Sequence, residues 1–234
     1  MLTVVPVEGV GEIRPGDGIA TAVYHAAAAQ GTPIENGDCV VVTQKIVSKA
    51  EGRLVPLDPD DAAARRALIE RESVRIVRRR DELVISETRH GFVCANAGID
   101  VSNVGDGVAA LLPVDPDRSA RRIRDALRAG HGVEAAVVVS DTFGRAWRIG
   151  LTDVAIGASG IAAVVDLKGT RDTGGRELRV TEIAIADEIA GAAELVMGKA
   201  RGVPAAIVRG LDPGWFAEGS ARDLVRRPSE DLFR

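Results

Sequence analysis

Short apolar runs alternate along this chain with longer amphipathic segments, and the alternation predicts a mixed α/β (α+β) fold with sheets flanked by helices. Runs of β-branched residues are typical of strands, whereas apolar residues recurring every three or four positions are typical of helices. The predicted strands are 2–7, 39–43, 83–86, 91–94, 109–112, 135–139, 178–181 and 205–208. The predicted helices are 19–30, 60–80, 118–128 and 183–196, and the pattern leaves the order of the strands open.

The charged stretch from Asp60 to Arg80 is predicted to be one long helix. Asp60 is a suitable N-cap, and a broken apolar stripe follows it among the charged residues. Arginines 78–80 would then form the solvated end of this helix, where the helix dipole favours positive charge. A ligand role for the three arginines is the alternative.

The composition is that of an ordinary globular protein. The 234 residues are 46% hydrophobic and 27% charged, which excludes a disordered chain. Without a repeat or an obvious linker, we expect residues 1–234 to form one unit, or two intertwined subdomains sharing a core. The net charge of −4 gives no reason to expect nucleic acid or a membrane as partner, so an anionic ligand must be held locally.

The two cysteines and the absence of targeting signals indicate the compartment. Cys39 lies within a predicted strand and Cys94 at the end of another, which favours buried free thiols over a disulfide. The sequence begins without a signal peptide pattern and contains no apolar run long enough to span a bilayer. We therefore expect a cytoplasmic protein.

Candidate chemistry is concentrated in residues 137–157, VVVSDTFGRAWRIGLTDVAIG. A buried strand is predicted to end at about residue 139 and to release Asp141 and Thr142 into a glycine-marked loop. Their oxygens suit a Mg²⁺-like ion, whereas the guanidinium groups of Arg145 and Arg148 suit a phosphate or carboxylate. These are the parts of a phosphoryl-transfer site. The alternative is that Asp141 only caps a loop or short helix.

A second acidic segment, NAGIDVSN at residues 96–103, also follows a short apolar strand and presents Asp100, Ser102 and Asn103. Two carboxylates arriving from different strand ends can hold one or two divalent ions between them. The alternative is that Asp100 and Asn103 close an Asx turn.

Two further segments offer positive charge. Lys45 and Lys49 follow a buried strand at a spacing that places both on one side, where they could meet a phosphate or form a solvated pair. Residues 197–204 combine two glycines with two cations, which suits a ligand approached by backbone amides, although a helix C-cap and turn would look the same. Common nucleotide, zinc and serine-hydrolase motifs are absent from the sequence.

Together these segments resemble the coenzyme F420-0:L-glutamate ligase (CofE) family. The resemblance runs from about Val4 to Gly210 and includes VVTQKIVSKAEGRLV, GFVCANAGIDVSNV, the 137–157 segment and ELRVTEIAIADEIAGAAELVMGKARGVP. It implies a CofE-like fold in the stand-alone form, without the C-terminal nitroreductase-like domain of related actinobacterial enzymes. It also implies a homodimer, for which apolar residues of the strands near the chain's end are a candidate surface.

The resemblance implies a GTP-dependent reaction. Members of the family add L-glutamate to the deazaflavin F420-0 through an acyl phosphate, and usually add further γ-linked glutamates. Mg²⁺ or Mn²⁺, as one or two ions, is the implied divalent cofactor, with K⁺ as a candidate monovalent ion. From the residues alone, a metal-dependent nucleotide phosphohydrolase and a non-catalytic nucleotide- or deazaflavin-binding protein are the alternatives.

The resemblance also assigns roles to individual residues. The metal ligands fall on Asp100, Asp141 and Thr142. The GTP contacts fall on Val10, Gly11, Glu12, Ile13, Gln44, Lys49, Asn103, Met197, Gly198, Lys199, Ala200, Arg201, Gly202, Val203 and Pro204.

Three positions qualify that assignment. Gln44 stands where members often carry serine or threonine. Lys199 stands where some carry a metal-binding glutamine, and a protonated lysine cannot replace it as a ligand. We add our own hypothesis that Arg145 and Arg148 stabilise the transferring phosphoryl group or grip the anionic deazaflavin tail. The alternative role for these two arginines is to orient neighbouring carboxylates.

Overall fold

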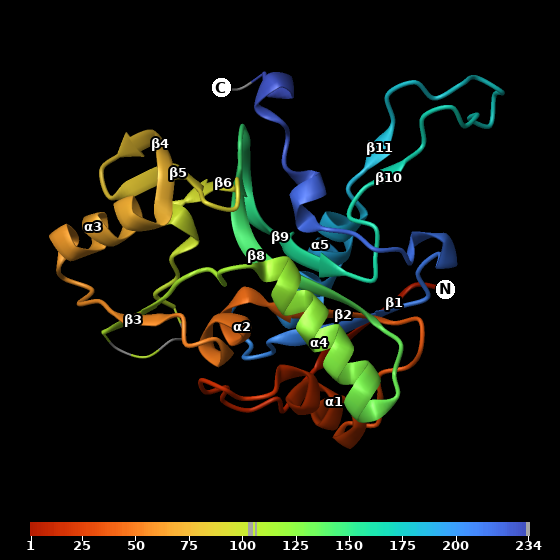
Figure 1. Ribbon diagram of the computed structural model, residues 1–234, viewed down its shortest axis with the longest axis horizontal. Helices are drawn as coiled ribbons and strands as arrows, with labels where there is room; N and C mark the ends of the chain where they lie inside the picture. Colours follow the sequence, from red (N-terminus) through yellow and green to blue (C-terminus); the bar gives the residue numbers. More distant parts are fainter. Residues whose placement is uncertain (103–104, 106, 233–234) are drawn as a thin grey trace.

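A five-stranded sheet with the strand order β1-β12-β2-β8-β9 forms the centre of the computed structural model, which describes residues 1–102, 105 and 107–232 (Figure 1). β2 and β8 run parallel, and the other neighbours in this sheet are antiparallel. The strands are β1 (Thr3–Val7), β2 (Cys39–Thr43), β8 (Ala136–Arg145), β9 (Arg148–Ser159) and β12 (Ala205–Arg209).

Helices cover both faces of this sheet. α1 (Ile19–Ala29) and α4 (Pro116–His131) pack on one face, and α5 (Ile185–Met197) packs on the other (Figure 1). Alternate valines of β2 enter the two cores, Val40 and Val42 on the α1/α4 side and Val41 on the α5 side. Burial on both faces explains why β2 is a continuous apolar run rather than an alternating one.

Smaller elements surround the central sheet. They are β4 (Ser73–Arg80), β5 (Leu83–Thr88) and β6 (Val93–Ala95) in one sheet, β3 (Leu54–Pro56) with β7 (Val108–Ala110), β10 (Val165–Asp166) with β11 (Glu182–Ile183), and the helices α2 (Gln44–Ala50) and α3 (Ala62–Glu72). One-turn 3-10 helices occupy Asn96–Gly98, Pro213–Trp215, Ala221–Leu224 and Pro228–Glu230. The chain between β10 and β11 projects from the body as an arm (Figure 1). The mixed α+β prediction is thus confirmed.

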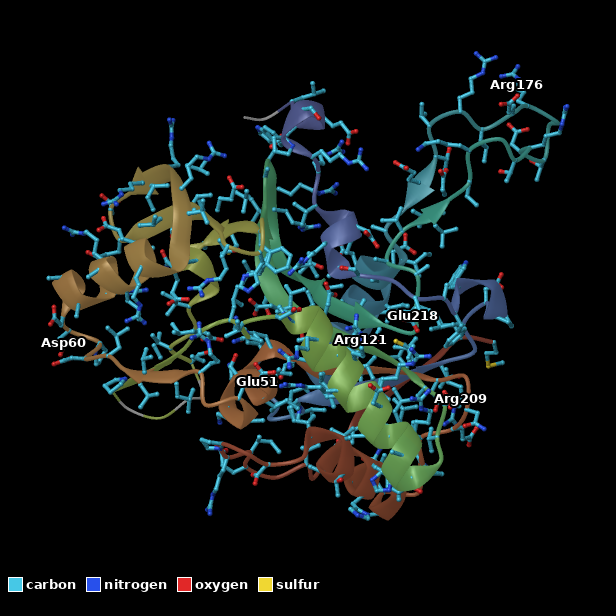
Figure 2. All side chains as sticks on the ribbon, viewed as in Figure 1. Glu51, Asp60, Arg121, Arg176, Arg209 and Glu218 are labelled. Atoms are coloured by element: carbon cyan, nitrogen blue, oxygen red, sulfur yellow. The ribbon has the colours of Figure 1, made fainter. Side chains whose placement is uncertain are left out.

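The prediction of one helix over 60–80 is wrong. α3 begins after Asp61, whose carboxylate accepts the N–H of Ala64, and Asp60 lies in the loop before it (Figure 2). From Ser73 the chain is the strand β4, which pairs with β5 and carries arginines 78–80. Pairing with β5 outweighs the weak helical periodicity of this charged segment.

Among the other differences from the predicted boundaries, three have a clear structural cause. β8 continues to Arg145 instead of ending near residue 139, because β9 folds back and pairs with it along its whole length. Residues 178–181 are irregular, and the chain forms its strand at Glu182–Ile183. α4 extends to His131 because Gly132, with φ +69°, supplies the left-handed C-cap.

Both cysteines are buried and free, as predicted. Within the described residues, the helices are too short or too polar for any of them to cross a bilayer.

Candidate functional site

A cavity of about 320 Å³ opens where β2 ends beside the middle of β8. Thr43 of β2 pairs with Ser140 of β8 in the parallel β2–β8 pair, so the two strands leave the buried part of the sheet at the same level. Ligands bind open sheets at this end of the strands. The residues lining the cavity are Gly11, Glu12, Ile13, Thr43, Gln44, Lys45, Ile46, Lys49, Asp100, Ser140, Asp141, Thr142, Asp153, Glu194, Met197, Gly198, Lys199, Ala200, Gly202, Val203 and Pro204.

The cavity therefore collects most of the predicted site residues from five separate segments of the chain. The backbone N–H of Thr43 donates to the carbonyl oxygen of Pro204 (2.9 Å), which holds the 197–204 segment beside the start of α2. Among the described residues, Val10, Arg145, Arg148 and Arg201 are predicted site residues outside the lining. Asn103 lies outside the described residues.

Lys45 and Lys49 lie on α2, so their spacing places both on the same side of a helix. The Lys45 ammonium lies 3.1 Å from a carboxylate oxygen of Asp100 and donates to the hydroxyl of Ser102 (3.1 Å). The Lys49 ammonium lies 2.6 Å from a carboxylate oxygen of Glu12. Their side chains are only 18% and 11% exposed, so they are paired within the site rather than solvated.

Gln44 is fully buried at the start of α2. Its side-chain amide nitrogen donates to the hydroxyl of Ser48 (2.6 Å) and to the carbonyl oxygen of Leu111 (3.1 Å). These contacts fix the first turn of α2 against the segment that follows β7. The amide nitrogen of Gln44 is therefore occupied by hydrogen bonds within the protein, although Gln44 still lines the cavity.

Carboxylates dominate the electrostatics of the cavity. Burial raises the pKa of Asp141 to about 7, and the neighbouring carboxylates of Asp100 and Asp153 add to the rise, while the N–H of Thr142 and the Lys199 ammonium oppose it. Burial also acts to raise the pKa of Asp100, but hydrogen bonds from Ser102 and the Lys45 ammonium leave that pKa below its ordinary value. The centre of the site is thus short of positive charge.

The donor chemistry suits a hard divalent cation, because Asp100, Asp141 and Thr142 offer carboxylate and hydroxyl oxygens. The part of the chain that the structure describes contains no group of three histidine, cysteine, aspartate or glutamate side chains already gathered for a metal ion. Asp100 already pairs with the Lys45 ammonium, which would compete with a cation for the Asp100 carboxylate.

Residues 197–204 form the turn that leaves α5. Gly198 and Gly202 have positive φ values of +59° and +70°, so the backbone follows a path that glycine favours. Lys199 lines the cavity, and its charge opposes the rise that burial causes in the pKa of Asp141 and Glu194. The Arg201 guanidinium instead donates to the carbonyl oxygen of Val196 (3.3 Å), at the end of α5.

Arg145 and Arg148 face each other at the turn between β8 and β9. Arg145 donates to the carbonyl oxygen of Ile149 (3.2 Å), and both arginines are exposed. The same hairpin end exposes Ile149 completely and Leu151 by 61%. The two guanidiniums therefore lie further along the hairpin than the acidic residues of the cavity.

Sequence reasoning missed two acids in the cavity. Asp153 on β9 is 3% exposed, and Glu194 on α5 carries a pKa raised first by burial and then by the charge of Asp153. Asp153 had a usable signal, because an acid inside an otherwise apolar strand is rarely buried without a partner or a function. Glu194 had none, since an acid is ordinary on an amphipathic helix.

Comparison with known proteins gives consistent matches. Residues 9–210 match the family model described as F420-0:Gamma-glutamyl ligase. The chain is 44% identical over 249 residues to the coenzyme F420:L-glutamate ligase of Methanothermobacter thermautotrophicus, covering 100% of this chain and 99% of the relative. It is 43% identical over 251 residues to the Methanopyrus kandleri protein of the same name (100% and 98% covered). The Methanocaldococcus jannaschii protein of that name is 42% identical over 217 residues (86% of each chain).

Proposed function

Because the chain belongs to the F420-0:gamma-glutamyl ligase family, it is a ligase, and we propose that it joins L-glutamate to coenzyme F420-0 at the expense of GTP. Further γ-linked glutamates are part of the proposal. The observation that carries it is that a glycine-containing turn, three lysines and the Asp100 and Asp141 carboxylates line one cavity. Such an assembly suits phosphoryl transfer, which depends on positioning and on neutralising charge.

The proposed reaction activates a carboxylate. A carboxylate is a poor electrophile at neutral pH, so the terminal carboxylate of F420-0 first takes the γ-phosphoryl group of GTP and GDP is released. The amine of glutamate then attacks the acyl phosphate, loses a proton and expels phosphate, leaving an amide. Each further glutamate would repeat these two steps on the new terminal carboxylate.

The residues around the cavity divide this work. Lys49, Lys199 and the backbone of 197–204 would meet the phosphates of GTP, and Gly11–Ile13, which also line the cavity, would add nucleotide contacts. Asp100, Asp141 and Thr142 would hold Mg²⁺ or Mn²⁺, which when bound offsets negative charge on the phosphates. K⁺ is a candidate monovalent ion in this proposal.

Arg145 and Arg148 lie outside the cavity lining, which favours a contact with the anionic deazaflavin tail over one with the transferring phosphoryl group. We expect Arg145→Ala to raise the KM for F420-0 about tenfold, because a charge-assisted hydrogen bond to an anionic tail contributes about 1.5 kcal/mol or more. The KM for GTP should stay within about twofold. Steady-state kinetics with each substrate varied in turn checks this.

The matched control is Arg176→Ala, which removes an exposed arginine from the arm beyond β10 (Figure 2). It should leave both constants unchanged. If Arg145→Ala leaves turnover and both KM values within a factor of about two, the arginine has no such role.

Homodimer formation in the cytoplasm completes the proposal. The strand nearest the end of the chain, β12, is unsuited to a subunit contact because Ala205–Val208 are buried. The exposed apolar residues Ile149 and Leu151 at the β8–β9 turn offer a better surface for the subunit contact.

The two free thiols agree with the reducing compartment that a cytoplasmic location implies.

One incubation tests the function against its alternatives. The protein is mixed with F420-0, glutamate, GTP and Mn²⁺, and the products are followed by mass spectrometry, with omission of glutamate as the control. We expect deazaflavin species heavier by one or more glutamyl residues, together with GDP. GTP loss that is independent of acceptor and glutamate would favour a phosphohydrolase. Nucleotide binding without any turnover would favour a binding protein.

A further inference from the structure

Asp153 makes two hydrogen bonds whose direction follows from chemistry. One carboxylate oxygen accepts the hydroxyl proton of Thr142 (2.8 Å), and the other accepts that of Ser140 (2.8 Å). An ionised carboxylate can only accept, so in both pairs the hydroxyl is the donor. Asp153 on β9 thereby contacts both of the hydroxyls that flank Asp141 on β8.

These bonds determine what the Thr142 hydroxyl offers to the cavity. A hydroxyl has one proton and two lone pairs, and here the proton is committed to Asp153. The remaining electron pairs of the Thr142 oxygen are therefore available to a hard cation, while no proton is left to repel it. Without Asp153, the hydroxyl could turn its proton toward the ligand.

The burial of Asp153 argues that this arrangement has a purpose beyond packing. The residue is 3% exposed, and among the residues that the structure describes its side-chain hydrogen-bond partners are two neutral hydroxyls rather than a lysine or arginine. A buried charge with neutral partners is expensive to keep, and a neutral residue would fill the same place in a strand more favourably.

We propose that Asp153 is a positioning residue that holds Thr142 as an oxygen ligand for the divalent cation, acting through the Thr142 hydroxyl rather than touching the substrate. The inference deepens the proposed function and rests on its metal site. Outer partners of metal ligands of this kind change metal affinity by about 10- to 100-fold when they are removed.

The test is a double-mutant cycle in which Mn²⁺ affinity is measured by electron paramagnetic resonance. Each variant is titrated with Mn²⁺ alone and with Mn²⁺ plus GDP. Asp153→Ala should weaken Mn²⁺ binding about tenfold or more, and Asp153→Asn, which keeps one acceptor oxygen, should weaken it less. Thr142→Val should weaken it similarly, whereas Thr142→Ser should restore binding. In the Thr142→Val background, Asp153→Ala should have little further effect, because the hydroxyl through which it acts is gone.

Asp187→Asn is the matched control, since Asp187 also accepts a hydrogen bond from β9, at the N–H of Ala155 (2.9 Å), but does not line the cavity. It should leave Mn²⁺ affinity unchanged. Thermal unfolding of each variant identifies any that fail to fold, and Asp153→Asn then replaces Asp153→Ala in the cycle.

Three outcomes overturn the inference. The first is unchanged Mn²⁺ affinity in folded Asp153 variants. The second is that Asp153→Ala lowers Mn²⁺ affinity equally in the wild-type and Thr142→Val backgrounds, which would indicate direct ligation or charge alone. The third is absence of Mn²⁺ binding by the wild-type protein. Because the readout is binding, the inference can fail while the glutamate ligation stands. It can also hold while ligation fails.

Discussion

Asp141→Asn is expected to lower metal-dependent ligation by about 100-fold or more while leaving the protein folded. Asp141 lines the cavity together with Asp100 and Asp153, and an amide in its place cannot supply the negative charge that a divalent cation requires. Turnover is measured as glutamate added to F420-0 per minute, and Mn²⁺ affinity is measured in parallel. Ligation at the wild-type rate would contradict the assignment of Asp141 to the metal.

The same variant should be more stable than the wild type when no metal is present. Folding raises the pKa of the Asp141 carboxyl to about 7, so the fold disfavours its ionised form. This destabilisation is complete above pH 7, and it shrinks as the pH falls toward the unfolded-state pKa near 4, where both states are protonated. Asn removes the effect, so the melting temperature of Asp141→Asn should exceed that of the wild type at pH 8, and the difference should narrow at pH 5.

Asp125→Asn is the control for both measurements. Asp125 is an exposed residue of α4 that pairs with Arg128. Its loss should change neither ligation nor the pH dependence of melting, because exposed ion pairs contribute little. A gain in stability confined to Asp141→Asn would mark the cavity as a place where function is kept at the expense of stability.

Strands β2 and β12 of the central sheet were predictable because they carry their own signal. β2 and β12 are apolar up to their last residues, Thr43 and Arg209, because the preceding residues are buried on both faces of the sheet. The segment 60–80 failed for the opposite reason. It is rich in charge, and what makes Ser73–Arg80 a strand is its pairing with β5, a contact that local periodicity does not record.

The candidate site was predictable as a set of segments but not as a set of contacts. Asp100 and Asp141 were recognised because each follows an apolar run, and the cavity contains both. The pairing of Lys45 with Asp100 joins residues that are distant along the chain, and no spacing rule specifies it. Asp153 was missed because β8 was expected to end before the hairpin, so its partner strand β9 was read as part of a loop.

Asp117→Ala is expected to lower the free energy of unfolding by about 4 kcal/mol, which is large for one residue. Asp117 lies in the first turn of α4 and is 8% exposed. One of its carboxylate oxygens accepts the N–H groups of Ala158 (2.8 Å) and Ala221 (2.9 Å), and the other accepts the hydroxyl of Ser220 (2.6 Å). Alanine would leave all three donors without their acceptor.

The close approach of α4 to β9 makes compensation difficult. A Cβ on Gly157 would lie 2.3 Å from the carbonyl oxygen of Pro116, so helix and strand are already as near as glycine allows. The structure around a missing Asp117 side chain therefore cannot simply close on itself. Denaturant unfolding with linear extrapolation measures the loss, and hydrogen exchange at Ala221 shows whether the C-terminal segment detaches first.

Two graded variants separate the contributions of Asp117. Ser220→Ala removes one donor and should lower the free energy of unfolding by about 1 kcal/mol, and Asp117→Asn, which keeps an acceptor for the two N–H groups, should fall between it and alanine. A loss below about 1 kcal/mol for Asp117→Ala would contradict the proposed link between α4, β9 and the tail. Because Asp117 lies outside the cavity lining, folded Asp117→Asn should bind Mn²⁺ as the wild type does. Asp141→Asn should instead lower Mn²⁺ affinity without lowering stability. The two variants would thus distinguish a carboxylate that stabilises the fold from one that serves the chemistry.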